Sequence, residues 1–229
     1  WVIWDLANQL DLYAGIHKGH RGALFGMSVK AGRLDVSNQG SVDSLFSDLV
    51  SFRDALHFHI DSEEKFIHPL LSDRVPAGAR VLEEEHREHN QRVDDLVAHL
   101  EGLRAKPAEF EKRREMALEF YRALNRFIAV YLVHINKEEE EVQPTLWKLC
   151  MDDELRAAFA KVLAHQGPKD VTQNLSMMIP AMSLDEVTTL YAGAKAVVPP
   201  QAVQAFTGLA ERLLSPDDWA VLKQRFAKI

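Results

Sequence analysis

Apolar side chains recur in steps of three and four residues over the first two thirds of the chain, the spacing that lines one face of an α-helix. The pattern predicts four long helices, over residues 5–30, 41–71, 77–106 and 107–149. Glycine and proline gather in the short links, and long helices joined by short links fold back on one another. Alternating β-branched runs, which would predict strands, are nearly absent. The sequence therefore predicts an all-α fold, an antiparallel up-down-up-down four-helix bundle.

The pattern changes after residue 149. Prolines divide the remainder into shorter helical segments, whose lengths no longer match those of the bundle helices. We therefore divide the chain into a four-helix bundle domain, residues 1–149, and a helical C-terminal extension of unknown role, residues 150–229. We expect the extension to pack on the bundle or on a partner, which makes it the candidate surface for a homodimer or for another protein.

Ionisable side chains interrupt the apolar stripe of every long helix. Each stripe carries at least one histidine, and two stripes carry a glutamate four residues later: His17 and His20, then His59 with Glu63, then His86 and His89, and finally His134 with Glu138. A single buried histidine is usually a hydrogen-bonded core residue, and a histidine four residues before an acid is common by chance. The repetition on all four stripes is therefore the feature that needs an explanation.

Two of these segments also share their surroundings. Each has a histidine, a glutamate four residues later and a proline ten residues later: His59, Glu63 and Pro69, and again His134, Glu138 and Pro144. The first and third helices share a different spacing, two histidines three residues apart. The four long helices thus look like two related helix pairs, and the candidate metal ligands recur in both.

A pair of divalent cations would stabilise these inward-facing groups. A buried, unpaired carboxylate costs several kcal/mol, so the two glutamates need a compensating positive charge. Imidazole and carboxylate ligands without thiolate suit iron, manganese or zinc. Four histidines and two glutamates divide between two ions, with the glutamates bridging, and six protein ligands leave coordination positions open to other molecules.

The spacing leaves alternatives open within this set. His20 fits the first stripe as well as His17 does, and His89 fits the third stripe as well as His86. The spare histidine of each pair would be an extra ligand or a hydrogen-bond partner of the ligands. Glu85 stands four residues before His89 and could replace a ligand there.

The remaining histidines have no such pattern. His57 falls off the stripe of its helix and is expected to be exposed or to support the helix. His68 directly precedes Pro69 and is expected to serve local capping. His99 and His165 have no partner pattern.

Composition and charge exclude several classes of protein. A net charge of −7 and a pI near 5.8 argue against nucleic-acid binding, which depends on clustered lysine and arginine. The apolar stretches are too short to span a membrane, and the first residues of this sequence do not have the basic segment followed by an apolar one that is typical of a signal peptide. A single cysteine excludes a disulfide framework within the chain. We expect a cytoplasmic protein without nucleic-acid or membrane partners.

Four segments together resemble the hemerythrin-like (HHE cation-binding) family: IHKGHR, HIDSEEKFIHPLL, EEEHREH and HINKEEEEVQP. The resemblance covers roughly residues 5–147 and implies a four-helix bundle with a non-heme di-iron centre. Position by position it favours these ligands of two iron ions: His17, His59, Glu63, His86, His134 and Glu138, or Glu139 if the H-x4-acid form applies. The oxygen-carrying hemerythrins also have H-x3-H on the third helix, whereas here Asn90 follows His86 at that offset.

The missing histidine leaves the function of the implied centre open between three hypotheses. The first is binding of oxygen or a related small oxidant, such as nitric oxide or peroxide, at a carboxylate-bridged di-iron site. The second is an oxygen-activating di-iron enzyme, an oxidase or oxygenase, that acts on a small organic substrate. The third is a sensor or adaptor in which residues 150–229 engage a partner. The sequence does not decide whether the protein is an enzyme.

Overall fold

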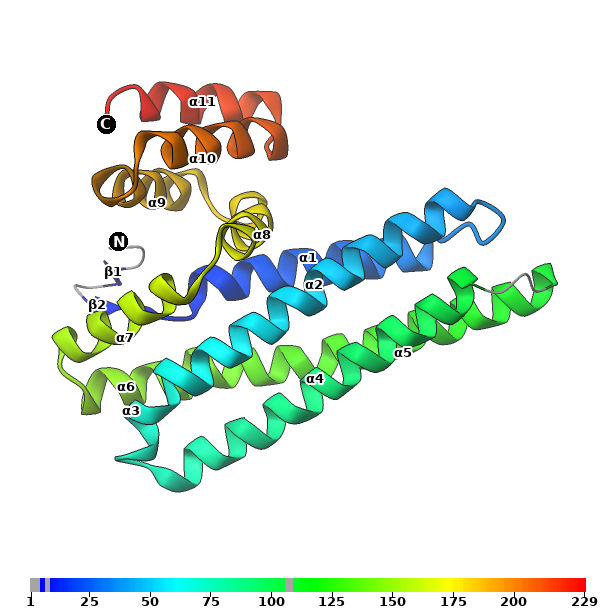
Figure 1. Cartoon of the computed structure of the whole chain (residues 1–229), viewed down its shortest axis with the longest axis horizontal. Helices are drawn as coiled ribbons and strands as arrows, with labels where there is room; N and C mark the ends of the chain where they lie inside the picture. The colour runs from blue at the N-terminus through cyan, green and yellow to red at the C-terminus, as the bar shows by residue number, and fades with distance from the viewer. Residues whose placement is uncertain (1–4, 7–8, 106–108) are drawn as a thin grey trace. The chain divides into compact units, whose positions relative to one another are not determined.

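The computed structural model describes residues 5–6, 9–105 and 109–229, and nearly all of them are helical (Figure 1). Two strands of two residues each, β1 (Asp5–Leu6) and β2 (Gln9–Leu10), pair antiparallel. The predicted all-α class is confirmed. The chain divides into two compact units. One is Ala23–Glu138, and the other combines the residues up to Gly22 with Glu139–Ile229.

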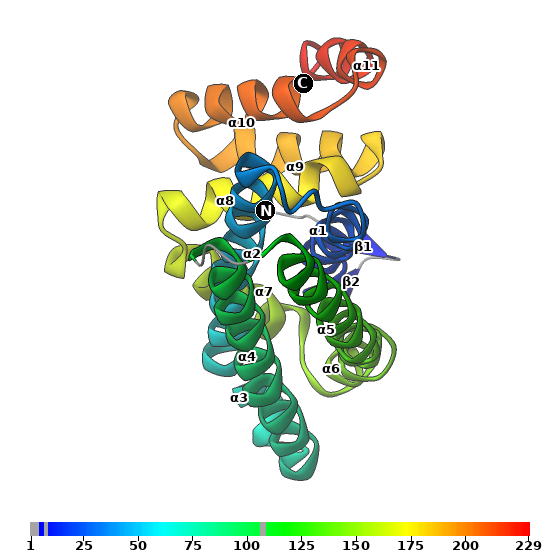
Figure 2. The same cartoon turned by 90° about the vertical axis from the view of Figure 1, so that its right-hand side faces the viewer.

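The unit Ala23–Glu138 is a bundle of long helices. It contains the second half of α1 (Ala14–Gly32) together with α2 (Gln39–Phe66), α3 (His68–Ser72), α4 (Pro76–Ala105) and α5 (Phe110–Lys137). Helix α4 lies beside both α2 and α5 (Figure 1, Figure 2). The predicted hemerythrin-like helical bundle is confirmed, whereas the up-down-up-down order of its helices stays a prediction.

Side-chain contacts connect α1 to its two neighbours in this unit. Lys30 Nζ donates to Asp48 Oδ2 on α2 at 2.5 Å. Ser28 Oγ donates to Asn125 Oδ1 on α5 at 2.8 Å. The second half of α1 therefore contacts both α2 and α5, and α4 packs against the same two helices.

The apolar stripes predicted from the sequence form this core. On α2 the fully buried residues recur in steps of three and four: Leu45, Leu49, Phe52 and Leu56. The matching stripe on α5 consists of Phe120, Leu124 and Phe127. Burying one such side chain contributes about 1.5 to 3 kcal/mol, so tertiary packing stabilises these helices more than their intrinsic propensity does.

Three predicted helices have different boundaries in the structure. The first begins at Ala14, because Asp11 Oδ1 accepts hydrogen bonds from the backbone N–H groups of Tyr13 and Ala14, both at 2.9 Å. The second is interrupted after Phe66, and a separate short helix α3 carries Pro69 in its first turn. The fourth changes at residue 138 into a π-helix, η1 (Glu138–Val142), before α6 (Gln143–Leu149).

The second unit is also helical. After α6 it contains α7 (Asp152–His165), α8 (Pro168–Met178), the 3-10 helix η2 (Ile179–Ala181), α9 (Leu184–Val197), α10 (Pro200–Leu213) and α11 (Pro216–Phe226). Its core includes the stacked rings of Tyr191 and Phe226, with centroids 3.8 Å apart, and the edge of Phe206. The division predicted from the sequence, after residue 149, stays a prediction.

The start of the chain belongs to this second unit. Gln143 Nε2 and Trp147 Nε1 both donate to the Leu10 carbonyl, at 3.3 and 2.8 Å. A Cβ atom added at Gly19 on α1 would lie 3.1 Å from the Met177 backbone, so only glycine fits this approach of α1 to α8 without a shift. Among the described residues, no helix combines the length and the apolar character that crossing a bilayer requires.

Candidate metal centre

Histidines and glutamates gather inside the unit Ala23–Glu138, where a core would ordinarily be apolar. They come from α2, α3, α4, α5 and the first residue of η1, and each is at least nine-tenths buried: His59, Glu63, His68, His86, His89, His134 and Glu138. We call these residues the buried cluster. Five members of the cluster belong to the ligand set predicted from the sequence. The remaining two members, His68 and His89, do not.

The two carboxylates of the buried cluster lie between its imidazoles. Glu63 places Oε1 3.2 Å from His59 Nε2 and Oε2 3.3 Å from His86 Nε2. Glu138 Oε1 lies 3.3 Å from His134 Nε2 and 3.6 Å from His86 Nε2. Each glutamate thus faces histidines from two helices, which is the arrangement that bridging ligands of two metal ions need.

Further carboxylates contact the outer nitrogens of two of these histidines. Glu64 Oε1 lies 3.2 Å from His86 Nδ1. Glu85 Oε2 lies 2.8 Å from His134 Nδ1, and Lys137 Nζ donates to its other oxygen at 2.7 Å. A carboxylate at Nδ1 fixes the tautomer and orientation of a metal-binding histidine, so that Nε2 is available to the metal. Glu85 was an open alternative for a ligand, and in this structure it orients His134.

His17 lies in the other unit and has an equivalent partner there. It is fully buried, and its Nδ1 lies 3.0 Å from Glu139 Oε1. Arg21 donates to both oxygens of Glu139, at 2.7 and 3.0 Å. Burial alone would raise the pKa of Glu139, but the hydrogen bonds from His17 and Arg21 outweigh it and lower that pKa to about 2. His20, the alternative on the same helix, is also fully buried.

Nearby carboxylates raise the pKa of two histidines of the buried cluster in the metal-free protein. Burial would lower the pKa of His86, but hydrogen bonds to Glu138, Glu63 and Glu64 raise it to about 11. Burial would lower the pKa of His134 as well, but the charge of Glu138 and a hydrogen bond to it outweigh burial and raise that pKa. In the absence of metal, protons on these two histidines therefore supply the positive charge that the glutamates need. A bound cation would replace those protons.

His68 and His89 have a different environment. Within the described part of the chain, neither ring nitrogen of either histidine has a hydrogen-bond partner. Burial, together with the positive charge on neighbouring histidines, lowers the pKa of His68 to about 4 and that of His89 to about 3. His68 stacks on His86, with centroids 5.0 Å apart, and His89 meets the ring of Tyr131 edge-on at 5.3 Å.

The sequence-based interpretation of His68 is wrong. Ile67 is the N-cap of α3, and no side-chain hydrogen bond caps that helix. On a continuous helix His68 would face away from His59, because nine residues at 100° each amount to half a turn beyond two full turns. The break at Ile67 brings the ring into the buried cluster instead, so a stripe drawn over residues 41–71 could not find it.

The donor set fits a divalent cation. Glu63, His68, His86 and Glu138 each offer one ligand atom within 4.8 Å of the others. Opposite ligands of one ion are about 4.2 Å apart when each metal–ligand bond is about 2.1 Å, so only a small contraction would close the site. The donors are imidazole and carboxylate groups, the set that iron, manganese and zinc bind.

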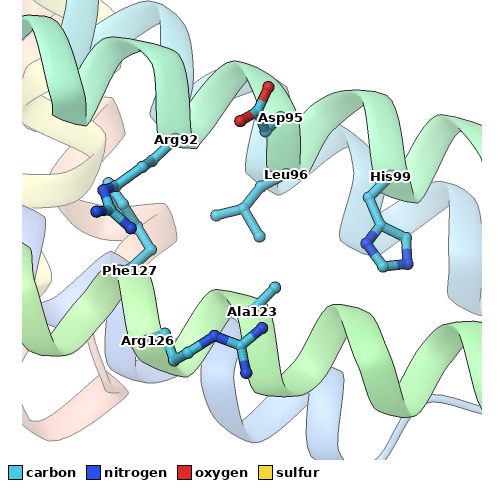
Figure 3. Close-up of a pocket in the computed structure, with 7 residues that line it drawn as sticks. All are labelled: Arg92, Asp95, Leu96, His99, Ala123, Arg126 and Phe127. Atoms are coloured by element: carbon cyan, nitrogen blue, oxygen red, sulfur yellow. The ribbon is translucent and has the colours of Figure 1, made fainter.

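A separate pocket of about 200 Å³ opens between α4 and α5 (Figure 3). Side chains from both helices line it: Arg92, Asp95, Leu96, His99, Ala123, Arg126 and Phe127. None of the predicted ligands lines it. Phe127 also contacts His89, with ring centroids 6.3 Å apart, and His89 in turn contacts His134 at 4.7 Å. The pocket wall therefore touches the buried cluster at His89.

A helical bundle with buried carboxylates between histidines defines a class of cation-binding proteins. The chain belongs to the hemerythrin HHE cation binding domain family, whose pattern it matches over residues 8–146. It is also similar to the F-box/LRR-repeat protein 5 of Xenopus laevis, with 25% identity over 169 residues. That match covers 73% of this chain and 24% of the relative. No solved structure matches the chain.

Family membership confirms the resemblance seen in the sequence, and with it the fold and a metal-binding role. The ligand set as a whole stays a prediction: His17, His59, Glu63, His86, His134 and Glu138. The sequence reasoning identified the groups that face the interior of the bundle. It missed the orienting role of Glu64 and Glu85, because acidic runs on helices usually face solvent.

Proposed function

We propose that this chain is a hemerythrin-like, non-heme di-iron protein that binds oxygen or a related small oxidant at a carboxylate-bridged centre. The observation that supports it best is the position of Glu63 and Glu138 between histidines of α2, α4 and α5. We infer that His59, His86 and His134 bind the ions through Nε2. His17, whose Nδ1 also faces a carboxylate, is the fourth proposed histidine ligand.

The protein contributes positioning and dryness to this centre. Tyr131 stacks on Phe127 with centroids 5.6 Å apart, and the edge of Phe52 meets Tyr131 at 6.3 Å. These buried rings lie against His89 and His134 and exclude water from that side of the cluster. Iron bound here would supply electrons and open coordination positions to a small oxidant. A dry surrounding slows the exchange of a bound oxidant with water.

Metal analysis with an optical spectrum tests this proposal. Protein produced in iron-rich medium should contain about two irons per chain and show the absorption of a carboxylate-bridged iron pair. The double substitution His59→Ala and His134→Ala should abolish both, whereas His99→Ala, outside the cluster, should change neither. Two irons in the double variant would overturn the ligand assignment.

The proposed ligand binding needs a separate measurement. The reduced protein is mixed anaerobically with oxygen and, in a parallel sample, with nitric oxide. We expect a change in the visible spectrum with either oxidant and its reversal when the gas is removed. Irreversible oxidation of the iron without any organic product would contradict reversible binding.

A second candidate function is an oxygen-activating enzyme, and the pocket between α4 and α5 favours it. Arg92 and Arg126 line this pocket against one carboxylate, Asp95, so its fixed charge is positive and it suits a small organic acid. Its wall residue Phe127 contacts His89, a member of the buried cluster. Succinate and benzoate are suitable probes. Faster oxygen consumption with either acid, lost in Arg126→Ala, would favour the enzyme, and an unchanged rate would favour oxidant binding alone.

The role of residues 150–229 is a further part of the proposal. The F-box/LRR-repeat protein 5 of Xenopus laevis is a much longer protein, and the match to this chain covers 24% of it. The name of that relative describes further parts, an F-box and LRR repeats. We propose that the C-terminal helices mediate a homodimer or bind a partner protein. Light scattering of the full chain, in reduced and oxidised iron states, would measure the molar mass, and a monomer in both states would exclude the homodimer.

A further inference from the structure

We propose that His68 is an additional ligand of the metal centre, supplied by the short helix α3. The inference rests on the proposed function, since it requires that the buried cluster binds metal. It assigns a role to a histidine that lies outside every helical stripe of the sequence.

Burial without a partner is the first observation. Only 1% of His68 is exposed, and within the described ranges no hydrogen bond reaches either ring nitrogen. A buried polar group without a partner costs about 1 to 3 kcal/mol, so such groups are rare in folded proteins. A bond from one nitrogen to a metal ion would remove this cost.

The position of the ring is the second observation. A nitrogen of His68 lies within 4.8 Å of ligand atoms from Glu63, His86 and Glu138. The His68 ring is nearly parallel to that of His86, with an interplanar angle of 14°. His68 therefore approaches the same two carboxylates as His86 does, from a neighbouring helix.

The backbone around His68 holds this position. Helix α2 ends at Phe66, and the N–H of its C-cap residue Ile67 still donates to the Glu63 carbonyl at 2.9 Å. Ile67 and Leu71 are both 4% exposed and anchor the two sides of the turn in the core. The break between α2 and α3 is thus a fixed part of the bundle, and it turns His68 toward Glu63.

His89 provides a matched comparison. It is buried to a similar degree, and its two ring nitrogens also lack a hydrogen-bond partner among the described residues. Its ring, however, lies against Phe127 and Tyr131, and it is absent from the group of mutually close ligand atoms that contains His68. Burial without a hydrogen-bond partner therefore does not by itself bring a histidine to Glu63 and Glu138, whereas the position of His68 does.

The experiment uses the full chain, Co²⁺ as the probe ion, and the variants His68→Leu and His99→Leu. In His68→Leu we expect about 100-fold weaker binding of one of two Co²⁺ ions and a changed visible spectrum. His99→Leu removes a histidine outside the buried cluster and should keep both ions and the spectrum. The metal-free His68→Leu protein should melt at a higher temperature than the metal-free wild type, because leucine needs no polar partner. Its Co²⁺-loaded form should melt at a lower temperature than the loaded wild type.

Chemical rescue separates a ligand from a packing residue. In His68→Gly, added imidazole should restore the Co²⁺ spectrum of the wild type, whereas toluene, which fills similar space without a nitrogen, should not. Wild-type affinity and spectrum in both His68 variants would overturn the inference. If His68→Leu fails to fold, the rescue of His68→Gly decides. A wild type that binds no Co²⁺ and no iron would overturn the proposed function itself, which is a different result.

Discussion

Glu85 places one carboxylate oxygen 2.8 Å from His134 Nδ1 and so fixes which nitrogen of that histidine faces the interior of the bundle. The other oxygen accepts a hydrogen bond from Lys137, one turn further along α5. Hydrogen bonding to these two groups lowers the pKa of Glu85 against the opposing effect of burial. The carboxylate is therefore charged and held in place before any metal arrives.

The first prediction concerns this orienting contact. Glu85→Ala should weaken metal binding by about 10- to 100-fold, because His134 loses the partner that holds its ring. Glu84→Ala is the matched control, since Glu84 is a neighbouring, exposed residue whose nearest basic partner is 3.9 Å away. Competition with a chromophoric chelator measures both affinities. Equal affinities in the two variants would show that Glu85 does not act on the metal centre.

The second prediction is that the metal-free protein loses stability in mild acid. The pKa values of His68 and His89 are lowered in the folded state to about 4 and about 3, from an ordinary value of 6.5. Between pH 6.5 and 4 the unfolded chain therefore binds more protons than the folded one. The free energy of unfolding should fall with decreasing pH, by up to about 1.4 kcal/mol per pH unit for each histidine.

Urea titrations with a chelator present, from pH 7 to pH 4.5, measure this slope. His86 contributes no slope well below pH 6.5, because its raised pKa keeps it protonated in the folded state and its ordinary pKa of 6.5 keeps it protonated in the unfolded chain. The stability that it provides is lost only as the pH rises from 6.5 toward 11. His89→Leu should reduce the acid slope, and a slope equal to that of the wild type would refute the assignment.

The third prediction concerns metal removal. A metal that binds only the folded state stabilises it by about 4 kcal/mol at a free concentration 1,000 times the dissociation constant. Treatment with a chelator should therefore lower the melting temperature, and Fe²⁺ added under anaerobic conditions should restore it. The His59→Ala and His134→Ala double variant should show no such shift. A shift of the same size in that variant would place the metal elsewhere.

The fourth prediction compares two glycines of α1. In Gly19→Ala the new Cβ would lie 3.1 Å from the Met177 backbone, which has no flexible side chain end to move aside. In Gly26→Ala the new Cβ would meet nothing within 4 Å. Thermal unfolding should thus show a loss for Gly19→Ala and a gain of about 0.5 to 1 kcal/mol for Gly26→Ala. Two gains of equal size would contradict the close approach of α1 to α8.

The sequence predicted the inward-facing groups because helical periodicity determines which face each side chain shares. His59, Glu63 and His134 lie in unbroken stretches of α-helix, and Glu138 directly follows α5 with helical backbone angles, so steps of three and four residues found them. Periodicity fails where a helix is interrupted. His68 follows such a break, and it is buried. The chain thus has asparagine at position 90, where the oxygen-carrying hemerythrins have a second histidine, but has a buried histidine at position 68.

The partners of the histidines were also beyond sequence reasoning. Glu64 and Glu85 contact His86 and His134, but each pair comes from different helices. The relative rotation of two neighbouring helices decides which acid of a run reaches an imidazole. That rotation follows from the packing of the whole core and leaves no local pattern in the chain.

The π-helix η1 bears on the ancestry of the fourth helix. A π turn closes with one more residue than an α turn, so a single inserted residue can be absorbed there while the flanking helical faces keep their directions. The two forms of the motif on this helix, H-x3-E and H-x4-D, differ by one residue. Glu138 and Glu139 stand side by side at the start of this turn. Descendants of such a helix can exchange one acidic ligand for its neighbour through a single insertion or deletion, without rebuilding the bundle.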